Sequence, residues 1–538
     1  MITNLIDWFL AFLPVLAVLI LMLRFHWDGA RAGAASWALA LLMAAVRFGA
    51  GWETLAYAQL KGLMLTLFVL YIIWGALLFY RVTDEAGAVK AIGAGLPRLT
   101  PDRGFQALLL GWIFSSFLQG MGGFGVPVAV VAPLLIGLGF PAVAAVVIPS
   151  IGHPWAVTFG SLGSSFFALM AATGRNGNEL APWAAALLGL ACLGCGAATL
   201  WVAGGRHTLR SNLTPLLLIG GTMAVTQYIV VINGFWSIGA MIAGLVGLAV
   251  GVAWARLGPQ RPHRRPHRRP HRRPHRRPAR GVRQSQPEGD EERSSGVALG
   301  WALLPYALLV AIILLAQVPL VESGLGQVVV NPKFPELTTS RGWVTEPGPG
   351  RSINIFGHAG ALLIYASLIT YAIYHKRGYY EAGAAGRIAR GVLQKATRSS
   401  LGTAAMVGMA VTMEHAGMTH LLADGIARVA GPAFPLVSPF IGVLGAFMTG
   451  SNTNSNVVFG SLQQSVATLI GVSPLIILAA QTAGAAIGSA FAPAKVIVGC
   501  STVGSGEEEG PVLKAVMRYG LLIVIVLAGV TALAIYLY

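Results

Sequence analysis

The chain has 538 residues, of which 55% are hydrophobic and 11% are charged, and its mean hydropathy is +0.69. A composition this apolar excludes an ordinary soluble domain and indicates a protein that crosses a membrane many times. The net charge of +17 would suit a nucleic-acid partner, but most of it is concentrated in one segment, so we expect none. Three cysteines are too few for a disulfide framework, and we attribute Cys192 and Cys195 to packing within a span.

The basic segment is a tandem Pro-His-Arg-Arg repeat that places eleven arginines between residues 261 and 283. A like-charged, proline-rich run cannot bury a core. We therefore predict a disordered cytoplasmic linker over residues 257–297. Metal capture by the histidines of the repeat and contact with anionic lipid remain open alternatives. These histidines are His263, His267, His271 and His275.

Apolar stretches of roughly 17 to 25 residues, long enough for a helix to cross about 30 Å of hydrocarbon, recur along the whole chain. The first is expected to be a retained span, because no basic segment or cleavage site of a signal peptide accompanies it. We predict about 12 spans in an all-α, polytopic membrane protein. They lie at residues 8–24, 33–50, 60–82, 141–172, 181–204, 213–232, 236–256, 298–320, 356–376, 396–413, 471–500 and 515–537.

The distribution of basic residues predicts the orientation in the plasma (inner) membrane. A cytoplasmic linker fixes one side, and the other short loops rich in Arg, Lys and His then fall on that same side, as the positive-inside bias requires. Both termini are expected outside the cell. Residues 320–353, rich in Pro, Gly and mixed charge, are expected to form an external loop.

Two apolar stretches, residues 105–138 and 434–471, are too long for one crossing and are interrupted by glycine or polar residues. Both must return to the side they entered if the basic loops are to share one face. We predict two re-entrant hairpins, the first with its tip at Gln119–Gly125 and the second at Gly450–Asn456. The hairpins would enter from opposite faces.

The two membrane halves, residues 1–256 and 298–538, show the same order of elements. A shift of 330 positions places Gly87 on Gly417 and Gly120 on Gly450, and a shift of 333 places Pro141 on Pro474. Because the copies have opposite orientation, we predict two inverted repeats, a recurring plan of transporters.

The run Thr449–Ser455 consists of seven small or hydrogen-bonding residues between apolar segments. Polar groups at membrane depth cost free energy unless they are paired, so such a run is expected only where it faces protein, water or a ligand. We expect a helix start at each tip, with Ser455 or Asn456 as the N-cap at the second and Pro127 in the first turn at the first.

Two further helix breaks are predicted, at Ser150–Pro154 and around Gly484–Pro493, with a helix starting at Pro154. Helix N-termini at four such breaks carry partial positive charge and would bind a small anion, most commonly a carboxylate. The candidate substrate-binding residues are Gly120, Gly122, Gly123, Gly125, Gly450, Ser451, Asn452, Thr453, Asn454, Ser455, Asn456, Gly152, Thr158, Thr482 and Ser489.

The glycine cluster at residues 120–125 superficially matches a dinucleotide-binding loop. No βαβ unit surrounds it, so we reject that interpretation and expect no cofactor. Helix packing is the alternative explanation for these glycines. No metal-ligand spacing or buried relay of charges is found, which argues against a membrane-embedded enzyme or a respiratory subunit.

At these residues the sequence resembles the bacterial L-lactate permease family, whose members carry lactate or glycolate together with protons. The most specific segments are Gly123–Val128, Gly450–Asn456 and Ala492–Ile497. The Ser451-Asn452-Thr453 tripeptide also resembles the hairpin tip of dicarboxylate transporters in the wider ion-transporter superfamily. The resemblance covers most of the chain outside the linker, and it implies inverted repeats, a homodimer and an elevator-like motion.

Family members commonly carry an acid before the first tip and another in the second, where this chain has Gln119 and Asn452. His153, whose ordinary pKa suits proton coupling, and Lys495, which could neutralise an anion, are therefore coupling candidates together with Gln119. Glu414 is a further candidate, although we place it at the interface, opening an amphipathic helix that runs to about Val429.

We predict a secondary active transporter of a small monocarboxylate, a lactate- or glycolate-like 2-hydroxy acid, that works by proton symport. The alternatives are a sodium-coupled carrier, a carrier of sulfonates, dicarboxylates or similar organic anions, and an anion channel. The partners expected are the organic anion, H+ or alternatively Na+, and the lipid membrane.

Overall fold

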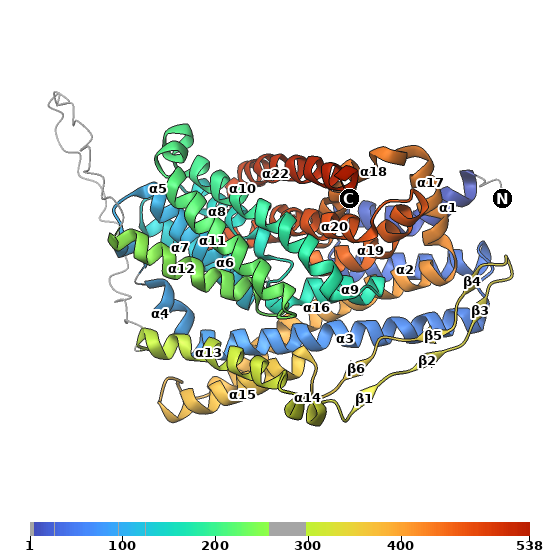
Figure 1. Ribbon diagram of the computed structural model, residues 1–538, viewed down its shortest axis with the longest axis horizontal. Helices are drawn as coiled ribbons and strands as arrows, with labels where there is room; N and C mark the ends of the chain where they lie inside the picture. Colours follow the sequence, from blue (N-terminus) through green and yellow to red (C-terminus); the bar gives the residue numbers. More distant parts are fainter. Residues whose placement is uncertain (1–4, 26, 95, 124, 258–296, 538) are drawn as a thin grey trace, which may run out of the picture.

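The computed structural model describes residues 5–25, 27–94, 96–123, 125–257 and 297–537. Almost all of the regular structure is helical, and many of the longer helices run along the longest axis of the molecule (Figure 1). The predicted linker at 257–297 lies outside the described residues except for its two end positions.

Four helical segments among the described residues of the first half are not of the α type. They are the 3-10 turns η1 (Leu96–Leu99), η3 (Pro154–Ala156) and η4 (Ser161–Gly163) and the π-helix η2 (Ala107–Phe114). The α-helices of this half are α1 (Leu5–Leu23), α2 (Gly29–Val46), α3 (Trp52–Glu85), α4 (Ala88–Ala94), α5 (Arg103–Gln106), α6 (Ser115–Met121), α7 (Val126–Gly137), α8 (Ala142–Gly152), α9 (Ser164–Thr173), α10 (Gly177–Ser211), α11 (Leu213–Ile232) and α12 (Gly239–Leu257).

The second half contains the 3-10 turns η5 (Gly431–Ala433), η6 (Ser489–Phe491) and η7 (Gly506–Glu508). Its α-helices are α13 (Leu299–Ala316), α14 (Pro319–Leu325), α15 (Ala359–Lys376), α16 (Ala384–His415), α17 (Met418–Ala430), α18 (Phe434–Thr449), α19 (Asn452–Leu469), α20 (Pro474–Gly488), α21 (Pro493–Thr502) and α22 (Glu509–Leu537).

Every range predicted as a span contains helix, and the described residues include 11 helical segments long and apolar enough to cross a membrane. The chain is thus a multi-pass membrane protein. The spans expected at 356–376 and 396–413 lie in α15 and α16, and neither helix is among the 11. The first half of α16 carries Arg387, Arg390, Lys395 and Arg398, so the apolar part of this helix is short.

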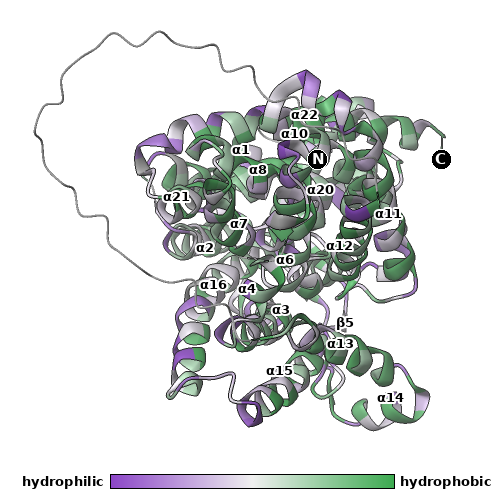
Figure 2. Cartoon of the chain, turned by 90° about the vertical axis from the view of Figure 1, so that its left-hand side faces the viewer, coloured by the Kyte–Doolittle hydropathy of each residue, from purple (hydrophilic) through white to green (hydrophobic). Residues whose placement is uncertain are grey.

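The helices form two layers. In Figures 1 and 2 the long helix α3 lies with α13 and α15 on one side of the molecule, and both hairpins and the broken helices lie on the other. Figure 2 also shows hydrophobic residues along nearly every helix, as expected where the outer surface faces lipid. Helix α16 packs against α3 and also reaches α19, so it lies between the two layers.

Each of the two ranges predicted as a re-entrant hairpin contains helical arms that pack against each other. In the first, α5, η2 and α6 lead to a break at Gly122–Gly125, and α7 returns; in the second, α18 leads to Gly450 and α19 returns. Figure 1 shows α5 and α7 near one end of the long axis and α17, which leads into α18, toward the other.

The segment predicted as an external loop is more ordered than expected. It contains α14 and three antiparallel strand pairs, and its tip contacts the other end of the chain: the Ser340 N–H donates to the Gly49 carbonyl at 2.8 Å, and Arg341 lies 3.6 Å from the Asp7 carboxylate. The pairs are β1 (Val329–Val330) with β6 (Ile353–Asn354), β2 (Lys333–Phe334) with β5 (Gly348–Pro349), and β3 (Leu337–Thr338) with β4 (Val344–Thr345).

Candidate functional site

The second hairpin turns at a glycine in a left-handed conformation. Gly450 has φ 68° and ends α18, and Ser451 follows it as the N-cap of α19, accepting a bond from the Asn454 N–H at 3.3 Å. The predicted caps, Ser455 and Asn456, are therefore wrong. The left-handed residue reverses the chain at once, so the polar run forms the first turns of α19 instead of an extended loop.

Two asparagines of α19 bind the broken helices of both halves. Asn452 Nδ2 donates to Thr158 Oγ1 at 3.1 Å, and Asn456 Nδ2 donates to Thr482 Oγ1 at 2.9 Å. The two threonine hydroxyls lie 3.1 Å apart. All four residues are at most 2% exposed. Four of the predicted binding residues, from three separate segments, are thus joined in one hydrogen-bonded cluster.

The residues between these asparagines face other neighbours. The Thr453 hydroxyl lies 3.0 Å from that of Ser165 at the start of α9, and Asn454 Oδ1 accepts from Thr403 of α16 at 3.1 Å. The Asn454 contact joins the hairpin to the helix that lies between the two layers.

Ser455 belongs to a buried ladder within the second hairpin. Its hydroxyl donates to the Gly442 carbonyl at 2.9 Å and accepts from Gln481 Nε2 at 3.0 Å. Gln481 Oε1 in turn accepts from Gln463, which accepts from Ser438 at 2.5 Å. The ladder ties both arms of the hairpin to α20, so the contacts of Ser455 are structural.

The first tip is made of glycines, and two of them, Gly122 and Gly123, have almost no room around them. Helix α6 continues to Met121, so the break is Gly122–Gly125, shorter than predicted. Gly123 has φ 55°, and a Cβ there would lie 1.9 Å from Ser161 Oγ. Gly125 has φ 83° and is the N-cap of α7, with Pro127 in the first turn as predicted.

The chain opposite this tip is strained. Ser161 and Leu162 have φ of 46° and 55°, a region that residues with a side chain rarely adopt. Gln119, in the last turn of α6, donates weakly to Ser161 Oγ at 3.5 Å. The first tip therefore packs directly against the Ser161 side chain, in the segment that follows the break in the first half.

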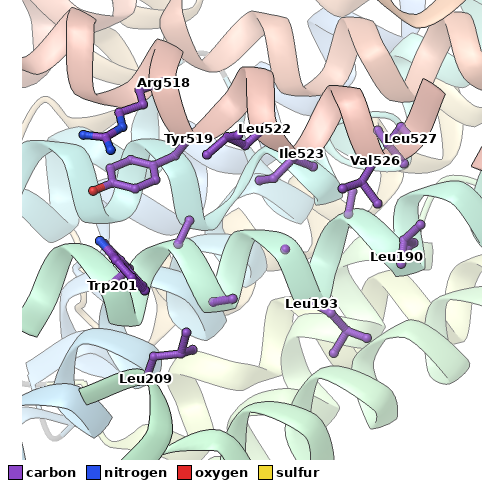
Figure 3. A pocket seen from close by; sticks show the side chains of 14 residues that line it. Leu190, Leu193, Trp201, Leu209, Arg518, Tyr519, Leu522, Ile523, Val526 and Leu527 are labelled. Carbon is purple, nitrogen blue, oxygen red and sulfur yellow. The ribbon is translucent and has the colours of Figure 1, made fainter. Parts of the chain in front are cut away.

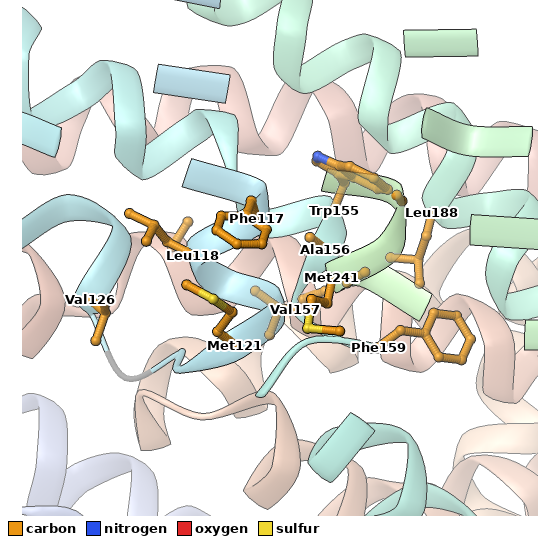
Figure 4. Close-up of a cluster of buried hydrophobic side chains, with 14 of the residues drawn as sticks. Phe117, Leu118, Met121, Val126, Trp155, Ala156, Val157, Phe159, Leu188 and Met241 are labelled. Carbon is orange, nitrogen blue, oxygen red and sulfur yellow. The ribbon is translucent and has the colours of Figure 1, made fainter. Parts of the chain in front are cut away.

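Apolar side chains surround this junction. Figure 4 shows Phe117, Leu118 and Met121 of the first hairpin next to Trp155 and Val157 of the broken segment. The Trp155 indole donates to Ser116 Oγ at 2.8 Å, and Ser116 donates to the Trp112 carbonyl at 2.7 Å. Pro154 starts a single 3-10 turn, so the helix start predicted there is present only as this turn, and the next α-helix begins at Ser164.

Two of the predicted binding glycines lie where they allow helices to pack. A Cβ on Gly120 would lie 2.6 Å from the Met241 backbone, and one on Gly152 would lie 2.0 Å from the Gly111 carbonyl oxygen. Gly120 is inside α6 whereas Gly450 ends α18, so the match between them that the 330-residue shift predicts does not hold at the tips.

The second broken helix ends in a lysine contact. Helix α20 runs to Gly488, η6 follows, and α21 begins at Pro493, within the predicted range of the break. Lys495 Nζ donates to Ser489 Oγ at 3.1 Å. In the first break, His153 Nδ1 lies 2.6 Å from the Pro149 carbonyl oxygen, and its ring is 1% exposed.

Glu414 does not open an amphipathic helix. It lies in the last turn of α16, and the amphipathic helix is α17, which starts at Met418 after a left-handed Gly417. The Glu414 side chain is exposed and accepts from Ser461 of α19 at 3.5 Å. Gly417 therefore marks the boundary between the two helices, which the sequence prediction had placed at Glu414.

Several buried polar atoms near these breaks have no hydrogen-bond partner among the described residues. They are Gln119 Oε1, His153 Nε2, Asn452 Oδ1 and Asn456 Oδ1. Three of the four are acceptor oxygens of amides. Since buried polar groups are nearly always paired, a set of unpaired acceptors beside four helix breaks is expected of a site that binds a ligand.

Sequence reasoning missed Ser161, Ser165 and Thr403. The run Gly160–Ser165 reads Gly-Ser-Leu-Gly-Ser-Ser inside an apolar stretch, which is the same signal that marked Thr449–Ser455. Thr403 is a single threonine in a long helix and carries no comparable signal. Only the fold brings it to Asn454.

These observations define a class: a polytopic membrane protein in which α19 and two broken helices meet in a buried polar cluster, an arrangement typical of membrane transporters. The model of the L-lactate permease family matches residues 7–538. The chain belongs to this family.

Individual relatives are distant but match nearly end to end. The chain is 26% identical to an L-lactate permease of Bacillus subtilis, covering 97% of this chain and 96% of the relative. It is 25% identical to the glycolate permease GlcA of Escherichia coli, covering 98% and 95%. Among solved structures, the YdaH transporter of Alcanivorax borkumensis matches with a TM-score of 0.43 and 13% identity, covering 86% of this chain and 84% of that one.

Proposed function

We propose that this protein is a secondary active transporter of a small 2-hydroxy monocarboxylate, such as lactate or glycolate, and that it works by proton symport in the plasma membrane. The names of the relatives support the substrate class, since the Bacillus protein is an L-lactate permease and the Escherichia protein a glycolate permease.

The unpaired oxygens of Asn452 and Asn456 at the start of α19 carry this proposal. The first N–H groups of a helix have no partner within it and carry partial positive charge, which suits a carboxylate. The amide oxygens of the two asparagines require a hydrogen-bond donor, and the 2-hydroxyl group of the substrate would supply it. A 2-hydroxy acid offers both groups on adjacent carbons.

The packing of the helices supports inverted repeats. Helix α2 packs on α16 while α15 packs on α3; α1 packs on α17 while α13 packs on α4; and α9 packs on α19 while α21 packs on α7. In each of these comparisons, the second contact is the first one with the two halves swapped. For example, α2 corresponds to α15, and α16 corresponds to α3. The two tips would then approach the substrate from opposite faces of the membrane.

In this proposal, transport is an elevator-type movement in which the hairpins and broken helices carry the substrate past the layer that contains α3 and α15. The hydrogen bond from Thr403 to Asn454 crosses between α16 and α19 and would break and reform during each cycle. The stationary layer would form the contact between two copies in a homodimer, with the basic linker in the cytoplasm and both termini outside.

For coupling, His153 is the best-placed proton carrier. Its Nε2 has no partner among the described residues, and the acids common in the family are replaced by Gln119 and Asn452. Sodium coupling is the alternative, because three unpaired amide oxygens together with the hydroxyls of Thr158 and Thr482 are the ligand type that hard cations prefer.

The test is uptake of radiolabelled lactate and glycolate by purified protein in liposomes with an imposed pH or sodium gradient. We expect uphill accumulation with an inward proton gradient and none with sodium alone. Accumulation that requires sodium and survives a proton uncoupler would reject proton symport, and failure to accumulate uphill would indicate a channel.

Asn452→Ala is expected to impair uptake, with Asn233→Ala as the matched control. Asn233 is an exposed asparagine whose side chain bonds only the Ile229 carbonyl of its own helix. Normal uptake by Asn452→Ala would remove this residue from the site. If the pH dependence of uptake is the same for His153→Gln and for the unaltered protein, His153 has no role in proton coupling.

A further inference from the structure

The outer faces of α10 and α22 form a groove of about 410 Å³ outside the transport site (Figure 3). Its walls are almost entirely aliphatic, with Leu193 and Ala197 on α10 and Leu522 and Val526 on α22. Leu522 and Val526 are 54% and 52% exposed. An open apolar furrow between two helices of a membrane protein is complementary in shape and chemistry to an acyl chain.

One end of the groove is polar and aromatic. Figure 3 shows Arg518, Tyr519 and Trp201 gathered at the same end, with Tyr519 on α22 facing Trp201 on α10. Arg518 is exposed, and no acidic side chain in the described part of the chain forms an ion pair with it. Trp and Tyr are typical of the level of the lipid headgroups, so this end marks the membrane boundary.

Further positive charge lies around that end. Helix α10 is kinked at Gly204 and Gly205, where φ is −177° and 65°, and the turn after the kink carries two exposed arginines, Arg206 and Arg210, next to Leu209, which lines the groove. The glutamates at the start of α22 lie at least nine residues before Arg518, more than two helical turns away. The end of the groove is thus cationic.

We propose that this groove binds an anionic phospholipid. Arg518 would hold the phosphate through charge-assisted hydrogen bonds, Tyr519 and Trp201 would lie beside the glycerol backbone, and one acyl chain would occupy the aliphatic furrow. A second copy of the chain fits less well, because it would bury Arg518 away from water without a described acidic partner. The inference does not depend on the transported substrate or on the coupling ion.

The test is native mass spectrometry of the full-length protein purified in detergent, with dioleoyl phosphatidylglycerol or dioleoyl phosphatidylcholine added. We expect the unaltered protein to retain phosphatidylglycerol, and Arg518→Gln to lower its retention about tenfold, the loss of one charge-assisted hydrogen bond. The matched control is Arg256→Gln, because Arg256 is an exposed arginine in the last turn of α12 that does not line the groove.

A second variant tests the apolar part. Ala197→Phe fills the furrow and should also reduce retention, while the melting temperature without lipid stays unchanged. Equal retention of both lipids, or equal phosphatidylglycerol binding by Arg518→Gln and the unaltered protein, would overturn the proposal. So would disulfide cross-linking of two copies through Leu522→Cys in the membrane, since the groove would then be an interface between copies.

Discussion

Both hairpin tips reverse the direction of the chain between two helical arms, but they consist of chemically different residues. The first turns through glycines so closely packed that a Cβ at Gly123 would overlap Ser161 Oγ. The second turns through one glycine, Gly450, with open space around it, and is followed by Asn452 and Asn456, whose side chains reach the broken helices. One tip offers backbone and the other offers amides and hydroxyls.

This difference indicates a division of roles. Close contact with the Ser161 side chain limits the room at the first tip, because a Cβ added at Gly123 must displace the Ser161 hydroxyl. In the proposed function, side-chain hydrogen bonds would give the second tip its selectivity, because amide and hydroxyl groups discriminate between ligands that can and cannot pair with them. Substitutions at matched positions in the two tips can break or sharpen this contrast.

The largest effect is expected at the first tip. Gly123→Ala introduces a Cβ 1.9 Å from Ser161 Oγ at a residue with φ 55°, so we expect uptake in liposomes to fall more than about tenfold, the equivalent of 1.4 kcal/mol or more. Gly450→Ala is the matched variant: its nearest contact is 3.9 Å away, and only the left-handed backbone costs about 1–2 kcal/mol. Equal loss in both variants would end the distinction.

The next effect concerns binding by the second tip. Asn456→Ala removes donors to Thr482 and to the Ser165 carbonyl, and we expect the half-saturating substrate concentration to rise about tenfold, as for a lost hydrogen bond of 1–2 kcal/mol. Gln119→Ala, which loses one weak bond of 3.5 Å, should raise it less. Concentration-dependent uptake measures both. A larger effect at Gln119 would assign selectivity to the first tip.

A stability effect without a binding effect is expected in the ladder behind the second tip. Gln481→Leu leaves Gln463 and Ser455 without their buried partner, which should cost about 1–3 kcal/mol and lower the melting temperature in detergent. The half-saturating concentration should stay close to normal. Gln317→Ala, at an exposed helix end, is the control. An unchanged melting temperature for Gln481→Leu would show that the ladder does not stabilise the hairpin.

The smallest effect is expected in the first hairpin. Ser116→Ala removes the acceptor of the Trp155 indole at a cost of about 1 kcal/mol, visible as a modest drop in melting temperature. Ser400→Ala is the comparison, since Ser400 accepts from the indole of Trp74, which is exposed and not buried. If Ser400→Ala destabilises the protein as much as Ser116→Ala does, side-chain bonds matter no more at the buried site than at the surface.

The sequence was informative where a signal is local. Apolar runs predicted the helices, and the polar run Thr449–Ser455, set in an apolar context, predicted the second tip and most of the residues of its cluster. The predicted cap failed because Ser451 and Ser455 are equally good caps by chemistry, and only the φ of Gly450 decides between them. Partners such as Thr403 depend on which helices pack side by side in the fold. The sequence of a single helix does not contain this information.

The strands between residues 329 and 354 were missed for a related reason. Each is two residues long, too short for an alternating pattern to appear. Their ribbon is held instead by contacts of its tip with Gly49 and Asp7, which lie 291 residues from Ser340 and 334 residues from Arg341 in the chain.

The π-helix at Ala107–Phe114 has a consequence for comparing the two halves. The arm from Arg103 to Met121 has three more residues than the arm from Phe434 to Thr449. A π-helix places more residues in each turn than an α-helix, so added residues widen the arm instead of lengthening it. The additional residues therefore make one helix wider without making it longer. Any alignment of the two halves without gaps loses its register at this helix, just before the glycines of the tip.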